Sequence, residues 1–187
     1  MTELKPVRVW TVGHSTRTLE MFITLLKHHG IQAVADVRRF PGSRRLPQYM
    51  SEQLEASLTA HGIAYIWIEE LGGRRRAPAD AAPSAWRNAS FRGYAEHLKS
   101  EEFAVGLNQL LRTATRQPTA IMCAELLWWR CHRSMVADVL KLKGIDVLHI
   151  QDEQRVIVHP FTSPARQVDG LLTYDERAGV PLNAGKR

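Results

Sequence analysis

The chain has 187 residues, of which 44% are hydrophobic and 24% charged, and its formal net charge is +6. This size and composition predict one globular domain. No run of about 18 apolar residues occurs, which argues against a membrane span. The first residues lack the apolar segment and cleavage site of a signal peptide, and the chain has only two cysteines. We therefore expect a cytoplasmic protein in which both cysteines are reduced.

Five segments have the β-branched and apolar composition of buried strands, namely 7–12, 31–37, 63–68, 119–123 and 145–150. Between them, apolar residues recur at helical spacing in five further segments, namely 18–29, 51–61, 91–98, 101–112 and 132–143. A short edge strand is expected at Val156–Val158. Residues 74–89 show no periodicity and predict a long irregular loop.

Strands that alternate with helices indicate βαβ units. The predicted fold class is α/β, a single-domain three-layer sandwich with a mostly parallel, roughly five-stranded, Rossmann-like sheet. The α/β domain is expected to cover residues 1–165, and residues 166–187 form a poorly patterned C-terminal tail.

Polar residues and glycines follow four of the predicted strands, where a parallel sheet places its ligands. They are His14 and Ser15 after Gly13, Asp36 and Arg38, Gly72 and Gly73, and Cys123 and Glu125. The topology of a parallel sheet would bring all of them to one edge.

Each of these residues also has an ordinary structural interpretation. Asp36 can cap a turn, His14 can bond a backbone carbonyl, and Ser15 can cap a helix. The pair Gly72 and Gly73 is typical of a turn with positive φ.

The segment 123–133 combines two thiols, a carboxylate, a histidine, two arginines and two tryptophans between a strand and a helix. A helix that begins near Cys131 would direct free backbone N–H groups at the strand end and stabilise an anion or a thiolate. Glu125 could accept a proton or orient an arginine. The alternative is that both cysteines behave as small buried hydrophobes and that Trp128 and Trp129 fill the core.

Three chemistries compete for this segment. A cysteine-phosphatase loop requires arginine as the sixth residue after the cysteine, and here that residue is Trp129. A zinc site could use Cys123, Cys131 and His132, but their spacing does not match the paired C-x2-C pattern. We therefore expect no metal and no cofactor. The third chemistry is an anion-binding pocket with a cysteine nucleophile or an acid/base pair.

Four motifs resemble those of the domain-of-unknown-function 488 family. They are Val-Gly-His-Ser at 12–15, Asp-Val-Arg-Arg-Phe-Pro-Gly-Ser-Arg at 36–44, Leu-Gly-Gly at 71–73, and Met-Cys-Ala-Glu followed by Cys-His-Arg within 122–133. The resemblance covers about residues 9–160, and the motifs occur in the family's order. It implies a compact α/β domain of bacteria and archaea, and it carries no established activity.

We predict a small cytoplasmic enzyme that acts on a phosphate-bearing substrate, such as a nucleotide or a nucleic-acid end. The predicted catalytic residues are Cys123, Glu125, His132, Asp36 and His14. The predicted anion-binding residues are Arg38, Ser43, Arg44, Arg130, Arg133, Ser15, Gly72 and Gly73.

Two other interpretations stay open. One is a nucleic-acid-binding module without catalysis, which the positive charge and the aromatics Trp86, Phe91, Trp128 and Trp129 would support. The other is a metal-binding domain. The chain has 19 arginines and 6 lysines, a ratio that suits phosphate recognition but also follows from a GC-rich genome.

Overall fold

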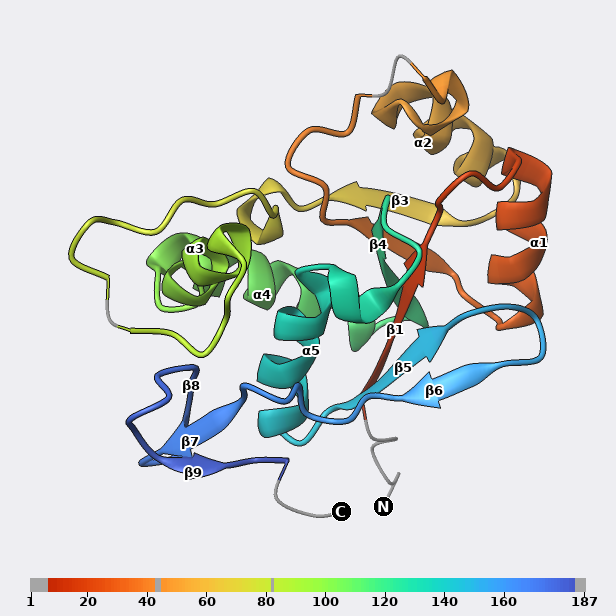
Figure 1. The fold of residues 1–187 in the computed structure, drawn as a ribbon. Helices are drawn as coiled ribbons and strands as arrows, with labels where there is room; N and C mark the ends of the chain where they lie inside the picture. Colours follow the sequence, from red (N-terminus) through yellow and green to blue (C-terminus); the bar gives the residue numbers. More distant parts are fainter. Residues whose placement is uncertain (1–6, 43–44, 82, 184–187) are drawn as a thin grey trace, which may run out of the picture.

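The computed structural model describes residues 7–42, 45–81 and 83–183. Its main element is a six-stranded sheet with the strand order β3-β2-β4-β1-β5-β6 (Figure 1). The strands are β1 (Arg8–Gly13), β2 (Ala33–Asp36), β3 (Ala64–Trp67), β4 (Thr119–Cys123), β5 (Asp146–Ile150) and β6 (Val156–Val158). All neighbouring strands are parallel except β5 and β6, which pair antiparallel.

Five α-helices connect and cover these strands. They are α1 (Leu19–His28), α2 (Ser51–Ala60), α3 (Ala89–His97), α4 (Glu101–Ala114) and α5 (Arg133–Leu142). Three short 3-10 helices lie in the loops, namely η1 (Pro47–Tyr49), η2 (Glu69–Leu71) and η3 (Trp128–Arg130). The α/β class, the mostly parallel sheet and the short edge strand are thereby confirmed.

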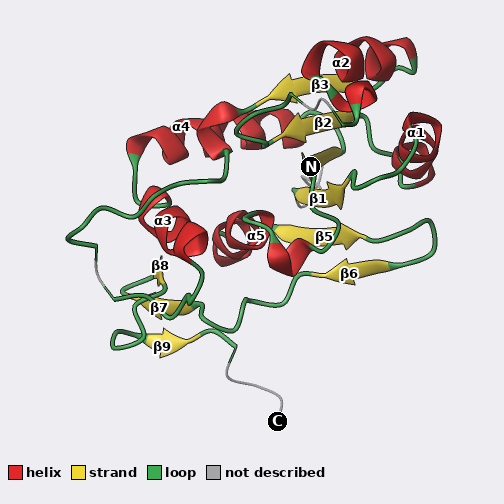
Figure 2. Cartoon of the chain, turned by 45° about the horizontal axis from the view of Figure 1, so that its top comes forward, coloured by secondary structure: helices red, strands yellow, loops and turns green. Residues whose placement is uncertain are grey.

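The sheet separates two hydrophobic cores, because alternate side chains of a strand point to opposite faces. Ala35 and Ile121 pack with residues of α4 and α5, whereas Val34 and Met122 pack with residues of α1 and α2. Figure 2 shows the helices on the two sides of the strands. This arrangement is the predicted three-layer sandwich.

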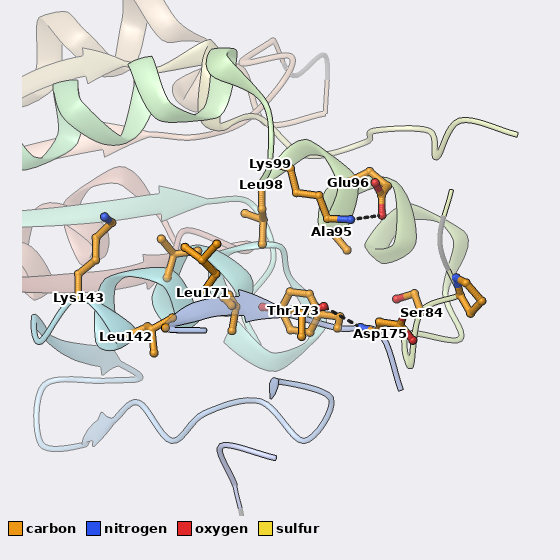
Figure 3. Close-up of a pocket in the computed structure, with 15 residues that line it drawn as sticks. Ser84, Ala95, Glu96, Leu98, Lys99, Leu142, Lys143, Leu171, Thr173 and Asp175 are labelled. Carbon is orange, nitrogen blue, oxygen red and sulfur yellow. Dashed lines mark hydrogen bonds and ion pairs between the residues drawn. The ribbon is translucent and has the colours of Figure 1, made fainter. Parts of the chain in front are cut away.

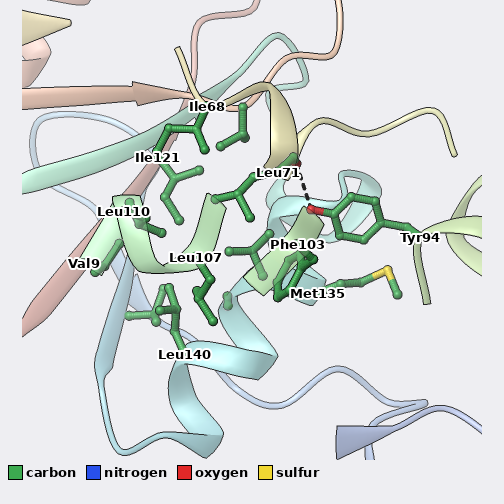
Figure 4. Packing of buried hydrophobic residues seen from close by; sticks show 14 of the residues in the cluster. Val9, Ile68, Leu71, Tyr94, Phe103, Leu107, Leu110, Ile121, Met135 and Leu140 are labelled. Atoms are coloured by element: carbon green, nitrogen blue, oxygen red, sulfur yellow. Dashed lines mark hydrogen bonds between the residues drawn. The ribbon is translucent and has the colours of Figure 1, made fainter. Parts of the chain in front are cut away.

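The larger core contains Tyr94, a buried tyrosine of α3 whose hydroxyl donates to the carbonyl of Leu71 at 2.8 Å (Figure 4). Its ring lies against those of Phe103 and His132, with centroids 6.3 Å and 5.0 Å away. This contact ties α3 to the loop that follows β3, and that loop carries predicted site residues.

The chain turns to opposite faces of the sheet at β1 and β4, which lie side by side. From β1 it enters α1 and reaches β2, and from β4 it enters α5 and reaches β5. A crevice forms at the carboxyl ends of two such strands, where α/β proteins bind ligands. The strand order differs from the dinucleotide-binding order 3-2-1-4-5-6, since β4 lies between β2 and β1.

Within 166–183, the described part of the poorly patterned tail, a second small sheet forms, with the order β8-β7-β9. Its strands are β7 (Arg166–Val168), β8 (Leu171–Thr173) and β9 (Val180–Pro181). Unlike the β-branched run Val156–Val158, these strands of two or three residues have no β-branched or alternating pattern, so sequence analysis did not predict them.

No helix of the described residues is both long enough and apolar enough to cross a membrane.

Candidate functional site

A cavity of about 740 Å³ opens at the carboxyl edge of the main sheet. The loops after β1, β2, β3 and β4 all contribute to its wall, through His14, Arg38, Gly73 and Cys123 among others. The four strand ends that sequence analysis singled out therefore meet at one cavity.

Two thiols and an imidazole form a compact cluster in its wall. Among the described residues, the ligand atoms of Cys123, Cys131 and His132 lie within 4.8 Å of one another. The Cys131 Sγ lies 3.5 Å from Nδ1 of His132. Cys131 is buried and only 5% exposed, whereas Cys123 is half-buried. The cluster is built by the end of β4 and the start of α5, which the strand–loop–helix order brings back to the same edge.

Hydrogen bonds to neighbouring groups hold this cluster in place. The Nε2 atom of His132 lies 3.0 Å from the carbonyl of Val37, and only an N–H can donate to that oxygen. Nδ1, which faces Cys131, is then the atom that carries a lone pair in the neutral ring. Arg133 donates through Nε to the Cys131 Sγ at 3.4 Å, and its NH2 group donates to the carbonyl of Glu125.

The two thiols have opposite protonation preferences. The hydrogen bond with Cys131, together with burial, raises the pKa of Cys123 well above its usual value. Burial also acts to raise the pKa of Cys131, but the hydrogen bond with Cys123 and the charge of Arg133 hold it well below its usual value. The two thiols are therefore linked by a hydrogen bond in which Cys123 is the group that holds its proton more strongly.

Asp36 and Arg38 form a buried ion pair beneath the cavity. Asp36 is 0% and Arg38 is 7% exposed, and the shortest contact joins NH2 of Arg38 to Oδ2 of Asp36 at 2.6 Å. Tyr65 donates its hydroxyl to the same carboxylate at 2.8 Å, and NH1 of Arg38 donates to the carbonyl of Tyr49 at 2.8 Å. Most of the donors of this guanidinium are therefore already engaged within the protein.

His14 is a neutral, stacked histidine in the cavity wall. Its ring lies on that of Tyr49, with centroids 3.9 Å apart, and its Nδ1 donates to the carbonyl of Ser15 at 2.9 Å. Burial lowers the pKa of His14 to about 4. The ring is therefore uncharged near pH 7, and Nε2 is its acceptor.

Among the described residues, four arginines and one glutamate line the cavity, namely Arg38, Arg39, Arg74, Arg130 and Glu125. Arg38 is paired with Asp36, and Arg39 lies 3.4 Å from a carboxylate oxygen of Glu102. The side chains of Arg74 and Arg130 are exposed and form no ion pair with any of the described residues. These two guanidinium groups give the cavity an excess positive charge.

Two glycines allow the close approaches that shape the wall. A Cβ atom on Gly73 would lie 2.7 Å from Nδ1 of His132, and one on Gly13 would lie 2.1 Å from the carbonyl oxygen of Glu125. Gly72 has φ −65° and Gly73 is not among the residues with positive φ. The expected positive-φ turn is thus wrong, and close packing accounts for the glycines instead.

Comparison with known proteins gives one family. The model described as "Domain of unknown function DUF488" matches residues 18–140. The chain belongs to this family. No curated protein and no solved structure matches the chain.

The DUF488 match spans Asp36, Arg38 and the whole Cys123/Cys131/His132 cluster. It begins after His14 and Ser15, although both line the cavity, and it ends before β5. The match identifies the family and assigns no reaction.

The predicted site residues fall into three groups. Those that line the cavity are His14, Ser15, Arg38, Gly73, Cys123, Glu125, Arg130 and His132. Asp36, Gly72 and Arg133 do not line it, because they are buried behind the residues that do. Ser43 and Arg44 lie outside the described residues.

A buried polar network beside the DUF488 cluster was missed by sequence analysis. His149 Nε2 lies 2.9 Å from His159 Nδ1, and His159 Nε2 lies 3.0 Å from a carboxylate oxygen of Asp138. Trp128 stacks on His149 with centroids 4.1 Å apart and planes 2° apart. The signal was available, since Asp138 interrupts the apolar face of α5 and His149 that of β5.

This network also changes the interpretation of the tryptophans. Trp128 is already stacked on His149 within the protein and cannot stack on a base from solution. Trp129, by contrast, is 46% exposed. Trp86 stacks on Phe91 within the protein, with centroids 4.7 Å apart.

A second cavity of about 410 Å³ lies between α3, α5 and β8 (Figure 3). Leu98, Leu142 and Leu171 make much of its wall, and its residue Lys99 pairs with Glu96 at 2.8 Å. No cysteine, histidine or arginine of the described residues lines it. The two thiols and the two unpaired arginines described above lie instead at the cavity of the carboxyl edge.

Proposed function

We propose that the protein is an enzyme that acts on a phosphate-bearing substrate, a nucleotide or a nucleic-acid end, in the cavity at the carboxyl edge of the sheet. One observation carries the proposal: the two unpaired guanidinium groups of Arg74 and Arg130 line the same cavity as the thiol–imidazole cluster. Arginine presents a planar fork of donors that matches phosphate oxygens.

The wall of the cavity supplies further groups that suit a phosphate. Ser15 lines it with φ 50°, and its hydroxyl is a donor within the same wall as the arginines. The described part of the wall has four arginines and one glutamate, which favours an anionic ligand. Because Arg38 and Arg39 are already paired, Arg74 and Arg130 would make the new contacts.

An exposed aromatic side chain favours a nucleotide over a bare phosphate. Phe40 is 66% exposed and lines the cavity. A base that stacks on an aromatic ring gains roughly 1–3 kcal/mol. The sugar and phosphate would then reach toward the arginines in the same cavity.

The chemistry would come from the cluster and from Glu125. Cys123 and His132 line the cavity, so a bound substrate could touch them. Glu125 is exposed and is the one carboxylate among the described residues of the wall, which makes it a candidate acid or base. Asp36 and Arg133 would act as positioning residues, since neither reaches the cavity.

A binding and activity screen tests the proposal. The protein is titrated with inorganic phosphate and with nucleoside monophosphates, and turnover is measured on a panel of nucleotides and phosphoesters. We expect saturable binding of nucleotides and turnover of at least one phosphoester, and loss of that turnover in Cys123→Ser and Glu125→Gln.

Arginine variants test where the phosphate of a nucleotide binds. Arg74→Ala and Arg130→Ala should each weaken nucleotide binding by at least tenfold, which is about 1.4 kcal/mol. Arg116→Ala is the matched control, because Arg116 is also an exposed arginine and lies three residues before the start of β4, at the opposite edge of the sheet. If all three variants lost nucleotide affinity equally, binding would reflect general charge attraction, and the assignment of the ligand to this cavity would be wrong.

A binding module without catalysis predicts another result. It would bind nucleic acid with an affinity that falls steeply with salt, and no member of the panel would turn over. Trp129 and Phe40, both exposed, would serve such a module as stacking platforms.

A further inference from the structure

We propose that Cys123, Cys131 and His132 bind one Zn²⁺ ion whose fourth coordination position faces the cavity. The site deepens the proposed function, and only the use of the metal rests on that function. The binding of the ion rests on the geometry of three side chains.

The spacing of the three ligand atoms matches tetrahedral zinc. With Zn–S near 2.3 Å and Zn–N near 2.0–2.1 Å, the S and N ligands of one tetrahedral ion lie about 3.6 Å apart. The Cys131 Sγ and the His132 Nδ1 are 3.5 Å apart. All three ligand atoms lie within 4.8 Å of one another, so small side-chain rotations would close the site.

The histidine already has the orientation of a metal ligand. Metal-ligating histidines usually donate their second N–H to a carbonyl or carboxylate, which fixes the tautomer. Here Nε2 donates to the carbonyl of Val37 at 3.0 Å, so the Nδ1 lone pair is left for the ion. Gly73 leaves room for this ring, because a Cβ there would come within 2.7 Å of Nδ1.

The surroundings suit two thiolates bound to a divalent cation. Arg133, which is 1% exposed, donates through Nε to the Cys131 Sγ at 3.4 Å, and N–H donors to ligating atoms are typical of the outer shell of a metal site. Two thiolates would neutralise Zn²⁺, and Arg133 keeps its own partners at the carbonyls of Glu125 and Leu126.

The number of ligands separates a structural site from a catalytic one. Structural zinc sites are closed by four protein ligands, whereas catalytic sites have three and keep one position for water or substrate. The described residues supply three, and all three line the cavity. The ion would therefore face the same space as Arg74 and Arg130.

Soft thiolate ligands favour zinc over the hard cations. Magnesium and calcium take oxygen ligands, whereas cysteine sulfur selects zinc and related soft ions. The C-x2-C pattern is absent because Cys123 and Cys131 are brought together by the loop between β4 and α5 rather than by a tight turn.

The test is metal binding by the full-length protein. The purified chain is stripped with a chelator and titrated with Zn²⁺, and Co²⁺ is used as a coloured substitute. We expect one ion per chain and a cobalt spectrum with thiolate charge-transfer bands and tetrahedral d–d bands. A stoichiometry near zero, or an octahedral cobalt spectrum, would overturn the proposal.

Three variants and a control refine the test. Cys123→Ser, Cys131→Ser and His132→Gln should each weaken Zn²⁺ binding by more than the roughly 10–100-fold that the loss of an outer-shell partner causes. His28→Gln is the control, since His28 is an exposed histidine at the end of α1. Unchanged Zn²⁺ affinity in all three ligand variants would reject the site.

A measurement on the wild type guards against misfolded variants. The rate at which a thiol reagent modifies Cys123 and Cys131 is compared in the chelated and the zinc-loaded protein. Zinc should protect both thiols, and equal rates would contradict the proposal. Nucleotide binding to the chelated protein tests the phosphate cavity separately, so the failure of one proposal leaves the other measurable.

Discussion

The pair of Asp36 and Arg38 shows how a charged residue is kept in the core. Taking both groups from water costs several kcal/mol for each ion, and the cost is offset only when every donor and acceptor has a partner. Here Tyr65, the carbonyl of Tyr49 and three contacts between the pair itself supply those partners. The pair thereby orders the loop after β2, which carries Arg39 and Phe40 to the cavity.

Asp36→Asn should therefore destabilise the protein strongly. The substitution leaves the guanidinium of Arg38 buried without its counter-charge, which typically costs about 3–5 kcal/mol. Chemical denaturation measures the change in the free energy of unfolding. Tyr65→Phe removes a single hydrogen bond to the same carboxylate and should cost about 1.5–3 kcal/mol. If Asp36→Asn lowered the free energy of unfolding by less than Tyr65→Phe does, the ion pair would have little structural role.

The variant Phe40→Ala distinguishes the contribution of the base to binding from that of the phosphate. Removal of the ring should weaken the binding of a nucleoside monophosphate by roughly 1–3 kcal/mol, the usual worth of a stacked base. The binding of inorganic phosphate should stay unchanged, since it has no base. Calorimetric titration of both ligands checks this. If both affinities fell equally, Phe40 would shape the cavity rather than stack a base.

At the scale of elements, the small sheet of β7, β8 and β9 is joined to α5 through one carboxylate. Asp138 is 0% exposed and accepts from the hydroxyl of Tyr174 at 2.7 Å and from the backbone N–H of Thr162 at 2.8 Å. His159 completes the set at 3.0 Å. One buried carboxylate of α5 thus holds two other segments, 159–162 and Tyr174.

A matched pair of tyrosine variants tests this arrangement. Tyr174→Phe removes a donor to a carboxylate, which should cost about 1.5–3 kcal/mol of unfolding free energy. Tyr94→Phe removes a donor to the carbonyl of Leu71 and should cost about 0.5–1.5 kcal/mol. Thermal and chemical denaturation of both variants gives the comparison. A larger loss for Tyr94→Phe would contradict the central role of Asp138.

The sequence predicted those helices and strands that are long enough to show a full apolar repeat. The ten-residue helices α1 and α5 and the five-residue strand β4 carry full apolar periods, and the strand ends located the cavity. The close approach of the three ligand atoms was not predictable, since seven residues lie between Cys123 and Cys131 and the distance between the two thiols depends on the path of η3. Asp36 and Arg133 were expected to touch the ligand, but a sequence does not show which polar residue turns inward to a partner.

At the scale of the whole molecule, buried neutral histidines set the response to acid. Burial lowers the pKa of His149 to about 2, and the charges of His159 and Arg133 act in the same direction. The unfolded chain binds a proton on this residue near pH 6.5, whereas the folded chain does not. The contribution of the neutral His149 to stability is therefore fully present above pH 6.5 and is lost as the pH drops from 6.5 toward 2.

Over this range, His149 should change the free energy of unfolding by about 1.4 kcal/mol per pH unit. Denaturation curves between pH 7 and pH 4.5 measure it, and His149→Asn should remove this part of the slope. The ring resonances of His149 in the wild type should not titrate above pH 4. A midpoint near 6.5 for those resonances would show that the residue is accessible and the network open.

The central claim is that the cavity at the carboxyl edge binds a phosphate beside the Cys123, Cys131 and His132 cluster. A crystal structure of the zinc-treated protein with a bound nucleoside monophosphate tests it most directly. We predict the phosphate against Arg74 and Arg130, the base near Phe40, and a zinc ion on the two cysteines and the histidine. A nucleotide bound at the opposite edge of the sheet, with this cavity free of ligand, would contradict the account.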